Sequence, residues 1–234
     1  MGDSTVFVLV HSPLLGPSSW AWVAQELRDR GRSALVPALL GGTDAPWSSW
    51  HDIVVKAASP DRRDTVVLVG HSAAGTLLPA IADSIPNDVA GLVFVDAFLP
   101  PSGGAAQLVP AQFIDNLRAL ATDDVLPPWS TWFGETAMRE LVPDAPRRAE
   151  VAADMPRMPL SSLLAPVPIP ERWARDPCAY VLLSAQYAAS AAEARTRGWP
   201  LAEIPDGKHL DSIRRPTAVT DALLAVERAM TCHG

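Results

Sequence analysis

A serine among small residues is the part of the sequence that most directly suggests chemistry. Residues 70–75 read GHSAAG and follow the apolar run TVVLV. A serine on a sharp turn between a strand and a helix can act as a nucleophile, and the strained turn requires small neighbours. We therefore expect Ser72 to be a nucleophile. The alternative is a small residue that only lets a strand and a helix pack closely.

A nucleophilic serine needs two partners. Its hydroxyl is a weak nucleophile until a histidine removes the proton, and a carboxylate orients that histidine. The sequence offers five histidines, at positions 11, 51, 71, 209 and 233. His11 is expected to be structural, holding its own loop through a backbone hydrogen bond. The position of the base therefore depends on how the chain folds.

Six apolar runs of strand length indicate the elements that position these residues. They cover residues 6–10, 34–36, 65–69, 91–95, 179–183 and 201–204. Most are apolar throughout, which is typical of parallel strands covered on both faces. Helical patterns lie between or after them, at 18–30, 50–58, 73–84, 187–197 and 211–229. For the first helix, Ser18 or Ser19 is the expected cap and Gly31 the expected end.

This alternation predicts an α/β fold, with a mostly parallel sheet of about six strands and helices on both faces. The connections should be right-handed, and functional residues should follow the carboxyl ends of the strands. Residues 100–177 interrupt the alternation for longer than a simple loop allows. They are rich in proline and contain the helix-like stretches FIDNLRALA and ETAMRELV. We interpret 1–99 and 178–234 as the core and 100–177 as a helical cap.

The chain resembles the α/β-hydrolase superfamily in four segments of the predicted core. These segments are GHSAAG, the loop HSPLLGPSSW after the first strand, VFVDAFLP, and the closing GKHL. The resemblance implies the chain order nucleophile, acid, histidine. It therefore makes His209, after the last strand, the expected base rather than an exposed loop histidine.

The acid is not where most proteins of this superfamily carry it, after the penultimate strand. That stretch reads YVLLSAQYAAS, and Tyr187 or Ala188 falls at the usual position. One strand earlier, FVDAFLP is similar to the acid-bearing segment in a branch of the haloalkane dehalogenases and the related coelenterazine luciferases. We therefore expect Asp96 to be the acid. Glu193, Asp206 or no acid at all are the alternatives.

The oxyanion-binding loop also departs from the family pattern. The backbone N–H of Ala73 should be one donor to the oxyanion. The resemblance places the other in a triplet His-Gly-X, which here reads His11, Ser12, Pro13. Because proline has no N–H, the second donor should come from Leu14 or from the Ser12 hydroxyl. Otherwise the protein stabilises a conventional oxyanion poorly.

Aromatic residues are the candidates for a substrate pocket. Trp129, Trp132 and Phe133 of the cap, with Tyr187, could line an apolar site, although aromatic clusters in caps also serve simply to pack. Trp20 and Trp22 fall on the first predicted helix and are expected in the core.

Composition limits the partners. The chain has 234 residues and a formal net charge of -7, which offers no basic surface for nucleic acid. No apolar stretch approaches the roughly 20 residues of a membrane span, and no signal peptide is evident at the start. The spacing of Cys178 and Cys232 suits neither a disulfide framework nor a metal site, so we expect a reduced, cytoplasmic protein. A homodimer is left open.

The function predicted from these features is cofactor-independent hydrolysis of an ester, thioester or lactone of an apolar small molecule. No metal-binding or nucleotide-binding motif is present in the sequence. Pro13 favours one alternative, a lyase, dehydratase or cyclase on the same scaffold that needs no acyl oxyanion. A catalytically silent protein that binds a small ligand is the other alternative.

Overall fold

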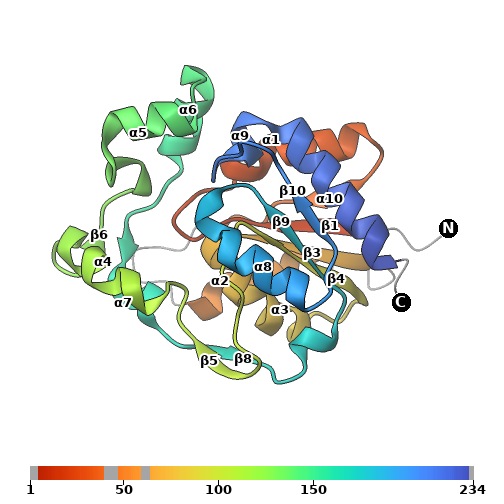
Figure 1. Cartoon of the computed structure of the whole chain (residues 1–234). Coiled ribbons are helices and arrows are strands. Elements are labelled where there is room, and N and C mark those ends of the chain that lie inside the picture. The colour runs from red at the N-terminus through yellow and green to blue at the C-terminus, as the bar shows by residue number, and fades with distance from the viewer. Residues whose placement is uncertain (1–4, 40–46, 59–63, 232–234) are drawn as a thin grey trace.

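A six-stranded parallel sheet forms the centre of the computed structural model, which describes residues 5–39, 47–58 and 64–231 (Figure 1). Its strand order is β10-β9-β4-β3-β1-β2, and every neighbouring pair is parallel. The strands are β1 (Thr5–Val10), β2 (Ser33–Leu35), β3 (Thr65–His71), β4 (Val89–Val95), β9 (Cys178–Leu182) and β10 (Leu201–Glu203). All six predicted strands are present, and the predicted α/β fold is confirmed.

Each central strand buries both of its faces, which explains why these runs are apolar without alternation. In β1, Phe7 and Val8 are both fully buried but belong to different core clusters, because successive side chains point to opposite faces of the sheet. One cluster contains residues of α2 (Trp47–Ala58), α3 (Leu78–Ser84) and α8 (Ala188–Thr196). The other contains residues of α1 (Ser18–Asp29) and α10 (Pro216–Thr231). Helices therefore cover both faces of the sheet.

Residues 100–177 contain four helices and four short strands. The helices are α4 (Ile114–Leu120), α5 (Gly134–Leu141), α6 (Ala145–Ala153) and α7 (Leu160–Leu164). The strands form two antiparallel pairs, β5 (Gly104–Ala106) with β8 (Val167–Ile169) and β6 (Val125–Leu126) with β7 (Met158–Pro159). Figure 1 shows α4, α5 and α6 outside the layers of the central sheet. The sequence predicted the helical character of this segment but not its small sheets.

Two predicted helices differ from those observed, and proline explains both differences. Residues 73–84 do not form one α-helix, because Ser72–Leu77 is a 3-10 helix and α3 begins at Leu78. Pro79 cannot donate to the carbonyl of Gly75, which accepts instead from Leu78. Residues 211–229 divide into α9 (Asp211–Arg214) and α10, because the residue before Pro216 is biased away from helical angles.

The predicted cap of α1 is wrong. Neither Ser18 nor Ser19 caps the helix with its side chain, although Gly31 follows its end with a φ of 74° as expected. Instead, the carboxylate of Asp154, just after α6, accepts from the backbone N–H of Ser18 at 2.9 Å and from its hydroxyl at 2.7 Å. A Cβ at Gly16 would lie 2.1 Å from the Asp154 carboxyl carbon, so this approach requires glycine. The segment 100–177 is thus fastened to the start of α1.

Replacing Asp154 should destabilise the protein measurably. Asp154→Ala leaves two donors at the start of α1 without their acceptor, and loss of a helix cap costs about 1 kcal/mol. We expect the free energy of unfolding in urea to fall by about that amount. The matched control is Asp115→Ala on the exposed face of α4, which should change stability by less than about 0.5 kcal/mol. Equal stabilities for the two variants would contradict the assigned role of Asp154.

Candidate active site

Ser72 lies on a strained turn directly after β3. Its φ is 57°, in the left-handed region that a residue with a side chain rarely adopts, and such strain costs on the order of 1–3 kcal/mol. Its neighbours must be small. A Cβ at Gly75 would lie 2.7 Å from the Cβ of Ala97, and one at Gly70 would lie 2.9 Å from the Leu78 side chain. These close approaches explain the glycines of GHSAAG.

His209 lies on the loop between β10 and α9, and side-chain hydrogen bonds of two arginines hold that loop. Asp211, which is fully buried, accepts from the side chains of Arg214 and Arg215. Those two guanidinium groups also donate to backbone carbonyls of the loop, at Asp206 and Pro205. The loop that carries His209 is therefore fixed from its own C-terminal side.

His71, beside the serine, holds the same loop from the other side. Its Nε2 donates to the carbonyl of His209 at 3.0 Å. Burial, together with repulsion from His209, lowers the pKa of His71 to about 3, so the ring stays neutral. His71 therefore connects the serine turn to the histidine loop without itself carrying charge.

Asp96 follows β4 and is completely buried, with a φ of 43°. One carboxylate oxygen accepts from the backbone N–H groups of Leu183 at 2.6 Å and Ser184 at 2.9 Å. The other accepts from the Ser184 hydroxyl at 2.5 Å and from Nδ1 of His209 at 3.0 Å. Burial by itself would raise the pKa of Asp96. The hydrogen bond and electrostatic attraction of His209, together with the hydrogen bonds of Ser184, outweigh the effect of burial and lower the pKa of Asp96.

The other two candidate acids lie apart from His209. Glu193 is exposed on α8 and pairs with Arg197. Asp206 is exposed at a positive φ of 53°. Within the described ranges, the only carboxylate hydrogen-bonded to His209 is that of Asp96. Because Nδ1 donates to this carboxylate, the neutral ring has its unprotonated Nε2 free to accept a proton.

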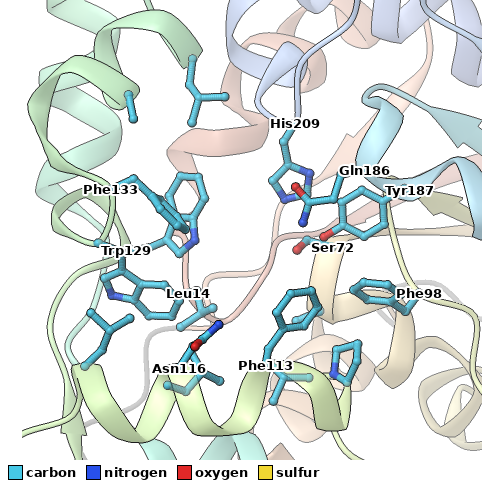
Figure 2. Close-up of a pocket in the computed structure, with 18 of the residues that line it drawn as sticks. Leu14, Ser72, Phe98, Phe113, Asn116, Trp129, Phe133, Gln186, Tyr187 and His209 are labelled. Carbon is cyan, nitrogen blue, oxygen red and sulfur yellow. The ribbon is translucent and has the colours of Figure 1, made fainter.

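An apolar cavity of about 550 Å³ brings Ser72 and His209 together. In Figure 2 the Ser72 side chain lies beneath the ring of His209, next to the hydroxyl of Tyr187. The four aromatic residues predicted to line a pocket, Trp129, Trp132, Phe133 and Tyr187, all line this cavity. Phe133 is 62% exposed, so it lies toward solvent. Trp20, by contrast, is a core residue as expected, and Trp22 is partly buried against another cluster.

Further lining residues escaped the sequence prediction. They are supplied mainly by the stretch around α4 and include Leu108, Phe113, Asn116, Leu117 and Leu120, together with Phe98 and Gln186. The helical spacing of Phe113, Leu117 and Leu120 was a visible signal of one apolar face. The sequence did not show whether that face turned toward the core or toward a ligand.

The predicted oxyanion loop is tightly held. Nδ1 of His11 donates to the carbonyl of Ser12 at 2.8 Å, and its Nε2 accepts from the N–H of Leu39 at 3.0 Å. Burial lowers the pKa of His11 to about 4, so His11 is a neutral structural residue here. The N–H of Leu14 lies 3.3 Å from the Ser12 hydroxyl, and the side chains of Leu14 and Ala73 line the cavity.

Neither a metal cluster nor a membrane-spanning helix is found in the parts of the chain that the structure describes. No group of three or more His, Cys, Asp or Glu side chains there is placed to hold a metal ion. No helix there is long and apolar enough to cross a bilayer. Cys178 is buried and reduced. Cys232 and His233 lie outside the described residues.

The sequence matches the alpha/beta hydrolase family over residues 7–222, and the chain belongs to this family. It is 31% identical over 134 residues to a carbendazim hydrolyzing esterase from Nocardioides sp. (strain SG-4G). That match spans 50% of this chain and 55% of the esterase, so the chain corresponds to about half of its relative.

Solved structures of low sequence identity share the fold. An extracellular alpha/beta-hydrolase from a Paenibacillus species has a TM-score of 0.73 at 18% identity, covering 95% of this chain and 98% of its own. A pyrethroid hydrolase from Sphingobium faniae has a TM-score of 0.71 at 19% identity, covering 97% and 98%. Tomato methylketone synthase I has a TM-score of 0.72 at 15% identity, covering 97% and 99%.

The buried Asp96 carboxylate should make stability depend on pH. Because its pKa is lower in the folded protein than the unfolded value of about 3.9, it stabilises the fold above that value. This contribution is lost as the pH falls through the folded pKa. We therefore expect wild type to exceed Asp96→Asn in unfolding free energy at neutral pH, with a gap that narrows on acidification.

Urea unfolding across this pH range tests the prediction. The exposed Asp115→Asn variant serves as the control and should show little difference from wild type at any pH. A gap between wild type and Asp96→Asn that stays constant down to about pH 3 would contradict an ionised Asp96.

Proposed function

We propose that this protein is a serine hydrolase that cleaves an ester, thioester or lactone of an apolar small molecule. The observation that carries the proposal is the hydrogen bond between the buried Asp96 carboxylate and Nδ1 of His209, in a cavity that His209 shares with Ser72. Family membership supports the same conclusion, and the likeness to a carbendazim hydrolyzing esterase supports cleavage of an ester-type bond.

The first half of the reaction acylates the serine. The Ser72 oxygen attacks the substrate carbonyl carbon while its proton passes to Nε2 of His209. Asp96 stays ionised and stabilises the imidazolium that forms. The N–H of Ala73 donates to the oxyanion of the tetrahedral intermediate. When the carbonyl re-forms, the bond to the leaving group breaks, and the leaving group takes the proton from His209.

The second half releases the acid. Water loses a proton to His209 as its oxygen attacks the acyl carbon on Ser72. The resulting tetrahedral intermediate collapses with cleavage of the bond to the Ser72 oxygen. His209 then returns the proton to Ser72. The protein is unchanged after one cycle and needs no cofactor.

The walls of the cavity favour an apolar and at least partly aromatic substrate. Trp129 and Phe113 face the same space as Ser72, and leucines from α4 complete that wall. Burying such a ligand against these side chains supplies binding energy in proportion to its apolar area. Asn116 and Gln186 are polar residues of the lining, as are the charged Glu140 and Lys208, and can orient a polar group of the ligand.

Ester hydrolysis and active-site labelling test this proposal together. Wild type should hydrolyse p-nitrophenyl esters and carbendazim-like aromatic esters, and a fluorophosphonate should modify Ser72. Ser72→Ala should lose labelling and reduce kcat by at least roughly 10³-fold, because the nucleophile is removed. The control Ser161→Ala changes an exposed serine of α7 and should behave as wild type. Equal labelling of wild type and Ser72→Ala would exclude this mechanism.

Pro13 favours one second candidate, a non-hydrolytic reaction in which Ser72 and His209 only transfer protons. Proline removes an N–H from the loop that usually helps bind an acyl oxyanion. A lyase or dehydratase reaction does not need that donor. This candidate predicts that no acyl group or phosphonate becomes attached to Ser72, while Ser72→Ala still abolishes turnover of the true substrate.

A further inference from the structure

The proposed reaction requires more stabilisation of negative charge than the backbone around Ser72 provides. Two or more donors commonly hold an oxyanion, and loss of one donor reduces kcat on the order of 10²–10³-fold. Here the N–H of Ala73 is one donor, and Pro13 has no N–H to offer. The N–H of Leu14 already lies 3.3 Å from the Ser12 hydroxyl. A further donor at the serine would therefore change the rate substantially.

The side chain of Tyr187 reaches this serine from another direction. Tyr187 ends the short 3-10 turn Ala185–Tyr187 that follows β9, at the strand end where the sequence lacked the usual acid. Its ring stacks on the ring of His209, with centroids 5.1 Å apart and planes inclined by 10°, and packs against Phe98 at 4.9 Å. Only 5% of the residue is exposed. These contacts fix the direction of its hydroxyl.

That hydroxyl lies beside the Ser72 hydroxyl inside the cavity (Figure 2). In the tetrahedral intermediate, the oxyanion and the Ser72 oxygen are bonded to the same carbon. A donor next to the serine oxygen is therefore within reach of the oxyanion as well. Burial raises the pKa of Tyr187 to about 12, and its interaction with Ser72 only partly opposes that rise. The phenol consequently keeps its proton at neutral pH and can donate it in a hydrogen bond.

We propose that Tyr187 is a further catalytic residue, whose hydroxyl donates a hydrogen bond to the oxyanion formed on attack by Ser72 and so supplies a donor that Pro13 cannot. This inference rests on the proposed serine-hydrolase function. No proton is transferred from Tyr187, because the hydrogen bond strengthens as charge develops and relaxes as the carbonyl re-forms. Packing against His209 and Phe98 needs only the aromatic ring. The proposed hydrogen bond gives a function to the hydroxyl, which that packing does not require.

The Tyr187→Phe variant separates the two contributions, because phenylalanine keeps the stacked ring and loses only the hydroxyl. We expect kcat for p-nitrophenyl acetate to fall about 10²-fold with KM nearly unchanged. Ethyl acetate, which has a much poorer leaving group, should show the same fold-loss, because an oxyanion donor acts on the acyl part common to both esters.

The matched control is Tyr180→Phe, which alters the other tyrosine of the chain. The Tyr180 hydroxyl donates to the carbonyl of Ala97 at 2.8 Å and is buried in the sheet. This variant should lower the urea midpoint of unfolding while its kcat stays within about twofold of wild type at a temperature where both are folded.

The outcomes separate this proposal from the function on which it rests. Hydrolysis by wild type, together with labelling of Ser72, establishes the proposed function independently of Tyr187. If that holds and Tyr187→Phe keeps kcat within about twofold, the role of Tyr187 is wrong. A loss confined to ethyl acetate would also overturn it, because the hydroxyl would then assist the leaving group. Absence of wild-type hydrolysis and labelling would overturn the proposed function itself.

Discussion

The site depends on the carboxylate of Asp96, which is completely buried from solvent. Removing an ionised carboxyl from water costs several kcal/mol unless hydrogen bonds compensate for it. Asp96 meets this requirement with two backbone N–H groups at the end of β9, the Ser184 hydroxyl and the ring of His209. The end of β4, the end of β9 and the loop after β10 must therefore meet at one point. The orientation of His209 follows from satisfying Asp96.

The serine turn is the second part of the same arrangement. Close packing against the next strand and helix surrounds its strained backbone and leaves no space for larger residues at Gly70 and Gly75. His71 connects this turn to the loop of His209 with one partly buried hydrogen bond. Ser72 and His209, the proposed nucleophile and base, are thus positioned by the core of the sheet, while the apolar walls around them come largely from residues 100–177. Substrate choice can change with those walls without disturbing the reacting groups.

The strands and the turn at Ser72 could be predicted from the sequence, because the residue patterns that indicate them are local. Six buried runs predicted six strands, and GHSAAG predicted a turn at Ser72, because strand burial and turn strain each restrict residue types within a few positions. Asp96 became a candidate only because no acid follows 179–183, an inference from absence that depended on a family resemblance. Pro79 and Pro216 were available as signals for the altered helices. Their effects on helix geometry follow from the missing N–H of proline and from the restricted backbone of the residue before it.

The remaining features depend on residues that are distant in the chain. Asp154 fastens α1 from 136 positions away, and no pattern around Ser18 indicates it. Tyr187 was expected only as part of an apolar wall. Its hydroxyl becomes a candidate oxyanion donor only in the folded structure, where the ring stacks on His209 and lies adjacent to Ser72.

In the proposed site, Asp96 holds the proton of His209 on Nδ1 and leaves Nε2 free for Ser72. Nitrogen-15 NMR of the His209 ring, assigned with His209→Gln and recorded where the ring is neutral, tests it most directly. We expect a protonated Nδ1 and an unprotonated Nε2 in wild type, with this preference lost in Asp96→Ala. A proton on Nε2 in wild type, or an unchanged tautomer in Asp96→Ala, would contradict it.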